Sequence, residues 1–211
     1  MGLLWHSSQD TFKYEINIKP CLELVTKRVV LSIISSIFDS TGLLVPVIVC
    51  HKIFLQQLWL RQIGWDEELP CDLQETWKKL YRRLPVLNNI SIPRSVKIEG
   101  EVTTKQIYGF SDASERAFGA CVYIHSGNAN GKLHSQLQCS KSRVSPVKHG
   151  SIPRLELCGV QLLARLIKAL PILCVPIDSI HLWTDSTLVL IWLQDIPKRC
   201  NTYVANMVSK I

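Results

Sequence analysis

The sequence predicts an α+β protein in which a helical segment is followed by a mixed β-sheet. Two observations lead to this prediction. Apolar residues recur at helical spacing through most of residues 26–84, whereas strand-like apolar runs dominate residues 106–139. The composition, 47% hydrophobic and 19% charged, is typical of a folded chain with a buried core.

In the first half, residues 3–18 predict a short strand pair, "LLW" and "TFKYEINI", joined by a polar turn. Three helices are expected next. The first begins at Thr26 and ends near Gly42, and the third opens with a capping-box pattern formed by Asp72 and Glu75. Their large aromatic side chains are expected to be buried, namely Phe54, Trp59, Trp77 and Tyr81. Nothing in these helices points to chemistry.

Residues 85–105 are interpreted as a connector, because they contain prolines and the polar pair Asn88 and Asn89. Beyond the connector we expect the element order βββαβα, an antiparallel start followed by a crossover. The first helix of this block, capped by Ser151, is apolar almost all round and is therefore expected to be buried. The segments concerned are "QIYGFSD", "AFGACVYI", "KLHSQLQCSK", "IPRLELCGVQLLARLIKAL", "DSIHLWTDS" and "STLVLIWL".

The positive charge lies mainly in the second half, where residues 101–211 hold 12 Lys and Arg against 7 Asp and Glu. This excess favours a polyanionic partner. The eight cysteines show no CxxC spacing, so a metal finger is excluded. The start of the chain has no signal-peptide pattern and no apolar run is long enough to span a bilayer. We therefore expect an intracellular protein, cytoplasmic or nuclear, with no membrane partner.

Three carboxylates stand where a structural role is hard to assign. Asp112 ends the first strand of the second half, Glu156 lies inside the apolar helix, and Asp185 ends the strand before the last helix. Each has a structural alternative, respectively a turn, an exposed helix face and a helix N-cap. Strand ends and a helix can converge at one edge of a sheet, and clustered carboxylates are tolerated chiefly when cations neutralise them. Together they predict a two-metal site of the kind that cleaves phosphodiesters.

The stretches "YGFSDASERAFGACVYI", "CSKSRVSPVKHGSIPRLELCGVQLLARLI" and "SIHLWTDSTLVLIWL" resemble the RNase H-like region of Pao/BEL-type LTR retrotransposon polyproteins. The stretch "TKRVVLSIISSIFDSTGLLVPVIVCHKIFLQQLWLRQIGWDEELP" resembles the reverse transcriptase thumb and connection that precede that region. The resemblance covers essentially the whole chain. It implies two domains: residues 1–95, the palm end with a helical thumb/connection segment, and residues 96–211, a truncated RNase H-like domain with a mixed sheet.

The resemblance also implies an activity. Asp112, Glu156 and Asp185 match the family's metal-binding acids, so they would bind Mg²⁺ or Mn²⁺ and hydrolyse the RNA strand of an RNA–DNA hybrid. The family's fold continues with a strand and a helix that bring a fourth carboxylate, whereas this chain stops at Ile211. We therefore expect the domain to be C-terminally incomplete and its hydrolysis to be weak or absent. The implied partners are a nucleic acid and the palm and fingers of the same polyprotein.

Two other interpretations stay open at this point. The chain could be a non-catalytic nucleic-acid-binding or assembly module, whose phosphate contacts would come from an acid-free basic run, namely Lys141, Arg143, Lys148 and Arg154. An aspartic peptidase, a label that the family often carries, is disfavoured. Such an enzyme needs two facing Asp-Thr/Ser-Gly loops, but "FDSTG" has one extra residue and "TDSTL" has no glycine.

Overall fold

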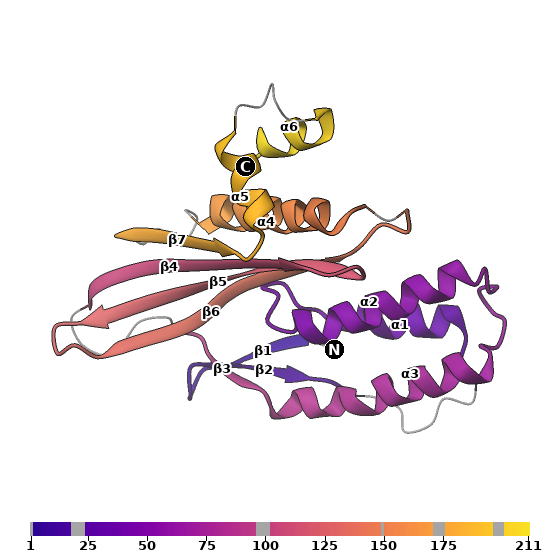
Figure 1. The fold of residues 1–211 in the computed structure, drawn as a ribbon. Coiled ribbons are helices and arrows are strands. Elements are labelled where there is room, and N and C mark those ends of the chain that lie inside the picture. Colours follow the sequence, from indigo (N-terminus) through magenta and orange to yellow (C-terminus); the bar gives the residue numbers. More distant parts are fainter. Residues whose placement is uncertain (1, 18–23, 96–101, 149, 171–175, 196–200) are drawn as a thin grey trace. The chain divides into compact units, whose positions relative to one another are not determined.

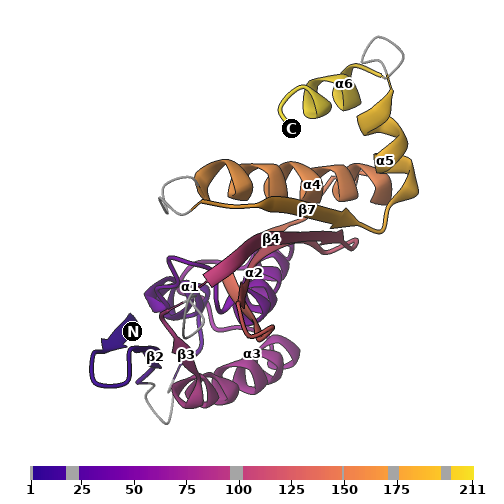
Figure 2. The same ribbon diagram turned by 90° about the vertical axis from the view of Figure 1, so that its left-hand side faces the viewer.

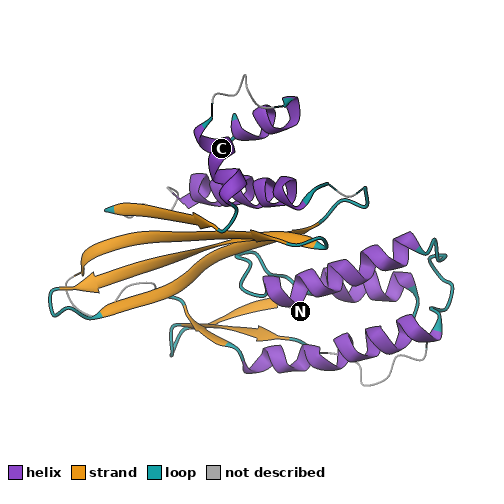
Figure 3. Ribbon diagram, viewed as in Figure 1, coloured by secondary structure: helices purple, strands orange, loops and turns teal. Residues whose placement is uncertain are grey.

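The structure, a computed structural model, describes most of the chain, namely residues 2–17, 24–95, 102–148, 150–170, 176–195 and 201–211. The chain divides into two compact units. Unit 1 comprises residues 1–40 and 46–95, and unit 2 comprises residues 41–45 and 96–211. Each unit contains both helices and strands (Figure 3), so the predicted α+β class is confirmed.

Unit 1 combines a small antiparallel sheet with three α-helices. The sheet has the strand order β1-β2-β3, with bounds Gly2–His6, Thr11–Glu15 and Ser91–Pro93. The helices are α1 (Lys27–Ser36), α2 (Val45–Leu60) and α3 (Cys71–Arg83), and the 3-10 helix η1 (Leu84–Asn89) follows α3 directly. The strand pair expected near the start of the chain is therefore present, and it gains a third strand from the stretch interpreted as a connector.

That stretch is more structured than the sequence indicated. Asn88, expected to lie in a loop, belongs to η1 and forms hydrogen bonds with Ile16, the residue directly after β2. Its Oδ1 accepts a hydrogen bond from the Ile16 N–H at 2.7 Å, and its Nδ2 donates to the Ile16 carbonyl at 3.1 Å. One amide side chain thus satisfies both backbone groups of a buried residue, as a neighbouring strand would. Residues 96–101 of the expected connector lie outside the described residues.

Two expected helix ends are corrected by the structure. The Thr26 N-cap of α1 is confirmed, since its Oγ1 accepts a hydrogen bond from the Val29 N–H, but α1 ends at Ser36 and not near Gly42. The expected capping box of α3 is wrong. Pro70 is the N-cap without a side-chain cap bond, and the Asp72 carboxylate instead accepts from Arg61 at 2.7 Å.

The aromatic core of unit 1 centres on Trp77, which is fully buried. Phe54 stacks on it with ring centroids 5.7 Å apart, and Tyr81 lies at 5.8 Å. These three match the expected burial. Trp59 does not, because it is 51% exposed. Its ring instead lies 3.9 Å from the ammonium of the buried Lys27, a cation–π contact.

Unit 2 is built on a four-stranded sheet with the order β6-β5-β4-β7 (Figure 1). The strands are β4 (Val102–Ala113), β5 (Ala117–Asn128), β6 (Leu133–Val144) and β7 (Ser179–Thr184). The first three pair antiparallel, whereas β7 pairs with β4 in parallel. With α4 (Ile152–Ala169) and α5 (Thr187–Gln194), the predicted order βββαβα is confirmed, and α6 (Thr202–Val208) follows it.

Helix α4 is buried on two sides, which explains its apolar sequence. One side packs on the sheet through Leu162 and Leu163, which join a core with Val122 and Ile124 of β5. The other side forms a second cluster with α5 and α6, and Figure 2 shows α6 on the side of α4 remote from the sheet. Ser151 is the N-cap residue as expected, although its side chain makes no capping hydrogen bond.

Two further expectations concern the chain as a whole. In the described part of the chain, no helix combines the length and apolar character that a bilayer crossing requires. Five cysteines are free thiols, namely Cys50, Cys71, Cys121, Cys139 and Cys158. The other three, Cys21, Cys174 and Cys200, lie outside the described residues.

Candidate functional site

Asp112 lies inside strand β4 rather than in the turn that follows it. It pairs with Gly119 of β5, and the tight turn begins two residues later at Ser114, whose N–H donates to the Ala117 carbonyl. The Asp112 Oδ1 accepts a hydrogen bond from the Ala113 N–H at 2.7 Å, and the side chain is exposed. The turn therefore does not account for this carboxylate.

Asp185 directly follows β7 and does not cap the helix after it. The N-cap of α5 is Ser186, whose Oγ accepts a hydrogen bond from the Val189 N–H at 3.4 Å. The Asp185 carboxylate is exposed. Because the serine takes the capping role, the aspartate is available for another one.

Glu156 lies in the second turn of α4 and is buried, with only 7% of the residue exposed. An exposed helix face is therefore excluded as its explanation. Its Oε2 has no hydrogen-bond partner in the described part of the chain. Burial, followed by the carboxylates of Asp185 and Asp112, raises the pKa of Glu156 to about 7, against an opposing effect of the Ala113 N–H.

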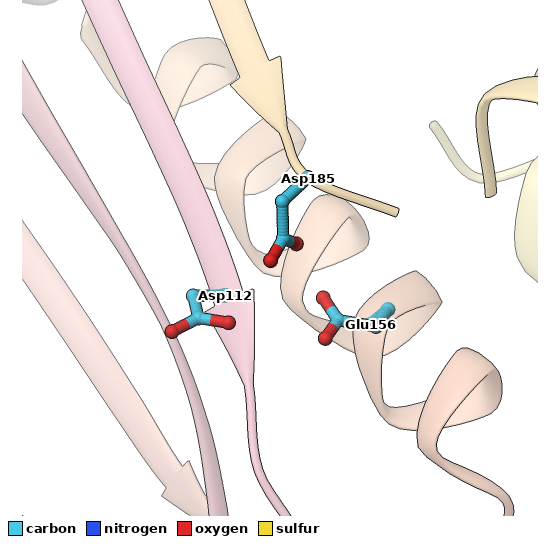
Figure 4. A group of neighbouring side chains, drawn as sticks. All are labelled: Asp112, Glu156 and Asp185. Atoms are coloured by element: carbon cyan, nitrogen blue, oxygen red, sulfur yellow. The ribbon is translucent and has the colours of Figure 1, made fainter. Parts of the chain in front are cut away.

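The structure brings the three carboxylates together. One oxygen from each residue lies within 4.8 Å of the oxygens of the other two. Figure 4 shows that they come from three elements, Asp112 from β4, Glu156 from α4 and Asp185 from the end of β7. Carboxylate oxygens at this spacing are a ligand set suited to a hard divalent cation such as Mg²⁺ or Mn²⁺. The buried oxygen of Glu156 fits that role, because it has no other partner.

The close approach of α4 to the sheet places Glu156 at this position. Gly159 lies one turn further along α4, where a Cβ atom would stand 3.4 Å from the Asp112 carbonyl oxygen and 3.6 Å from that of Gly119. The helix backbone is therefore in direct contact with the paired strands beside Asp112. The "LELCG" stretch thus supplies both the carboxylate and a residue whose backbone packs against the strands.

The four basic residues predicted from sequence are all exposed, but they do not share one location. Lys141 and Arg143 lie two positions apart on β6, on the face of the sheet that α4 covers. Lys148 belongs to the loop before α4. Arg154, in the first turn of α4, has its guanidinium 5.1 Å from the Tyr203 ring of α6. Their binding to nucleic acid stays a prediction.

One basic residue of interest is absent from the predicted set. Arg165 of α4 lines the same cavity as Arg143, although 22 positions separate them in sequence. No local pattern distinguishes it from the other basic residues of α4, Arg154 and Lys168. Only the tertiary structure places it beside Arg143.

A comparison with protein-family models confirms the family resemblance drawn from the sequence. A family model described as the Pao retrotransposon-like RNaseH-like domain matches residues 26–186, more than half of the chain. A search of curated proteins gives no match. Among solved structures, the chain is similar to a foamy viral protease-reverse transcriptase dRH in complex with ds DNA, with 16% identity and a TM-score of 0.40.

That similarity covers 85% of this chain and 32% of the viral chain, so this protein spans about a third of its length. The family model extends from the start of α1 to the residue after Asp185, and it therefore includes all three clustered carboxylates. The chain belongs to the Pao retrotransposon family, in which it represents the RNaseH-like domain.

Proposed function

We propose that this protein hydrolyses the RNA strand of an RNA–DNA hybrid with divalent metal ions held by Asp112, Glu156 and Asp185. One observation carries the proposal. A buried carboxylate with an unpartnered oxygen lies within 4.8 Å of two further carboxylate oxygens. An ionised group in that position is costly unless a cation is paired with it.

The three residues differ in burial and would therefore have different roles in holding the metal ions. Asp112 and Asp185 are exposed and can hold an ion that also contacts a substrate phosphate, whereas Glu156 is buried and can contact only the ion. When bound, two divalent ions supply an activated water as nucleophile and stabilise the charge that develops on the phosphate. Mg²⁺ and Mn²⁺ both suit an all-oxygen ligand set.

The proposed substrate class rests on the description of the family as RNaseH-like. A hybrid is distinguished from duplex DNA by the 2′-hydroxyls in its shallow minor groove. We expect hydrolysis to be weak, because two of the three carboxylates are open to solvent. Two-metal chemistry loses much of its rate when the ions are misplaced by a small distance.

The domain assignment is part of the same proposal. Residues 1–95 would be the palm end and the helical thumb/connection segment, and residues 96–211 the RNase H-like domain. The division of the structure between residues 95 and 96 supports this boundary, except that residues 41–45 belong to unit 2. The matched family model, by contrast, spans the boundary, from residue 26 to residue 186. The palm and fingers of the same polyprotein would be the protein partner.

Two alternatives predict different results. A non-catalytic nucleic-acid-binding module would bind hybrids without cleaving them, and the exposed basic residues of β6 and α4 favour this as the second candidate. Aspartic peptidase activity stays disfavoured, since the sequence lacks paired Asp-Thr/Ser-Gly loops and the matched family model is described as RNaseH-like.

The test is cleavage of an end-labelled RNA–DNA hybrid in Mg²⁺ or Mn²⁺, with duplex DNA as the substrate control. We expect slow cleavage that Asp112→Asn and Asp185→Asn both abolish. Glu115→Gln is the matched control, because Glu115 is exposed three positions from Asp112 but lies outside the cluster. Binding without cleavage in every metal would favour the binding module, and cleavage equal in all variants would overturn the proposed site.

A further inference from the structure

A cavity of about 190 Å³ lies between β5, β6, α4 and α6, away from the carboxylate cluster. Three residues that line it, Cys158, Gln161 and Arg165, recur along α4 at spacings of three and four, so they share one flank of the helix. Glu156 comes two positions before Cys158 and therefore lies on the opposite flank. The cavity is thus separate from the cluster, and the proposed metal chemistry does not use it.

Much of the cavity wall is apolar. Phe118 of β5, Leu162 of α4 and Met207 of α6 all line it. An apolar cavity of about 150 Å³ can hold a benzene molecule. The cavity therefore has room for a group the size of an aromatic ring, and burial of such a group against these side chains is favourable.

Two arginines make the cavity positively charged. Arg143 from β6 and Arg165 from α4 both line it, and no Asp or Glu is among the described residues that do so. In the described part of the chain, neither guanidinium takes part in an ion pair. Guanidinium groups match the two oxygens of a carboxylate with parallel N–H donors, so an anion of that shape would have two partners here.

The polar side chains of the cavity have only weak partners. Gln161 is 8% exposed, and its Nε2 donates to the thioether sulfur of Met207 at 3.4 Å. The Tyr203 hydroxyl pairs with the Cys158 thiol at 3.3 Å. Because sulfur takes part only in weak hydrogen bonds, the amide and the hydroxyl would both gain from an anionic oxygen in the cavity.

We infer that this cavity binds an apolar group that carries a carboxylate. The apolar group lies against Phe118 and Met207, and its carboxylate pairs with the two arginines. An inorganic anion would leave the apolar wall without a partner, and a neutral ring would leave the guanidiniums unpaired. The same chemistry occurs in a free small carboxylate and in the C-terminal residue of a polypeptide with an apolar side chain.

The first experiment titrates the protein with benzoate, in chelator so that metal binding plays no part, and follows the NMR signal of the Gln161 side-chain amide. We expect a saturable shift, equal in the unmodified protein and in Asp112→Asn. Benzamide lacks the charge and inorganic phosphate lacks the ring, so both should bind about tenfold more weakly. No shift with benzoate would overturn the site, and phosphate that binds as tightly as benzoate would overturn the assigned ligand class.

Two further probes distinguish the sources of the ligand. N-acetylphenylalanine presents the carboxylate as a polypeptide C-terminus does, and its C-terminal amide lacks the charge. Binding of the acid at least as tight as that of benzoate, and lost in the amide, would assign the site to a polypeptide C-terminus. Binding of benzoate alone would assign it to a free small carboxylate. An amide that binds as well as its acid would contradict the inference.

The second experiment repeats the benzoate titration in variants of the charged end. Both arginines are exposed, so their substitution should leave the fold intact. Arg143→Gln and Arg165→Gln should each weaken binding about tenfold. Arg165→Lys keeps the charge without the paired donors and should recover only part of the affinity. Lys132→Gln, in the hairpin at the opposite end of β5, is the charge-matched control and should change little.

A variant of the apolar end completes the test. Cys158→Phe places a ring in the cavity and keeps both arginines, so it should abolish benzoate binding. Binding that is unchanged in Cys158→Phe, or arginine variants that bind benzoate as tightly as Lys132→Gln does, would show that benzoate binds elsewhere and that the inference is wrong.

Discussion

Asp112 and Asp185 occupy equivalent positions on two neighbouring parallel strands. The β4–β7 ladder ends at the pair Ser111 and Thr184, and each aspartate is the next residue along its strand. Parallel strands place their carboxyl ends at the same edge of a sheet, so the register alone brings these two side chains together. Glu156 then reaches the same edge from α4.

The first prediction tests whether the exact position of Asp185 matters. Exchanging two neighbours, by Asp185→Ser together with Ser186→Asp, keeps the composition and charge of the chain. Aspartate is as good an N-cap as serine, so α5 should stay intact. The carboxylate moves one position and leaves the cluster, so affinity for Mn²⁺, measured by isothermal titration calorimetry, should be lost. Unchanged affinity would show that any nearby acid suffices.

The second prediction concerns stability without metal. The folded-state pKa of Glu156, about 7, lies above its ordinary value of 4.5, so between these values the folded protein binds more protons than the unfolded chain. The free energy of unfolding should therefore fall as pH rises from about 4.5 to 7. Glu156→Gln cannot ionise and should be more stable than the unmodified protein at pH 8 by about 1–2 kcal/mol.

Chemical denaturation in chelator at pH 5 and pH 8 checks this prediction. The gain should shrink at pH 5, where Glu156 is protonated in the folded protein. Glu115→Gln, an exposed substitution of the same type, should show no such pH dependence. A variant that is destabilised equally at both pH values would indicate instead that the Gln amide is poorly accommodated.

The third prediction concerns the pH dependence of metal binding. A cation binds the ionised form of Glu156, so the proton must leave when the metal enters. Affinity for Mg²⁺ or Mn²⁺ should fall about tenfold for each pH unit below 7 and level off above it. Calorimetry in buffers of different ionisation enthalpy should detect proton release near pH 6. Affinity that is constant from pH 5.5 to 8 would contradict a role for Glu156.

The fourth prediction concerns the buried Lys27 of unit 1. Its ammonium donates to the Ile63 carbonyl at 2.8 Å and lies 3.9 Å from the Trp59 ring. Lys27→Ala removes both contacts and should lower the free energy of unfolding by about 2 kcal/mol. Lys52→Ala, on the exposed face of α2, should change it by less than about 0.5 kcal/mol. Equal effects would mean that Lys27 is not structural.

Much of unit 2 is predictable from the sequence because its signals are local. Alternating runs identify β4 and β5, and the apolar pattern of α4 identifies a buried helix. Asp112, Glu156 and Asp185 stand out because charged residues rarely interrupt such segments. Which edge they share depends on strand register, which no local pattern of this length specifies.

Three of the missed features depend on contacts outside the local sequence window. Asn88 pairs with Ile16 across 72 positions, and its sequence context is that of an ordinary loop. Trp59 has the helical spacing of a core residue, yet its partner is the ammonium of Lys27. Asp72 stands where a capping residue is common, but the nearby Arg61 competes for its carboxylate. In each case a tertiary partner overrides the local propensity.

The parallel pairing of β7 with β4 also sets the order in which the sheet and the carboxylate cluster can form during synthesis. The meander β4–β5–β6 can form as soon as those strands leave the ribosome, but the site stays incomplete until β7 inserts beside β4 after α4 has been made. Contacts of such long sequence separation form late and slowly. A nascent or proteolysed chain that ends before β7 would therefore have most of its sheet but would lack Asp185, so the carboxylate cluster could not form.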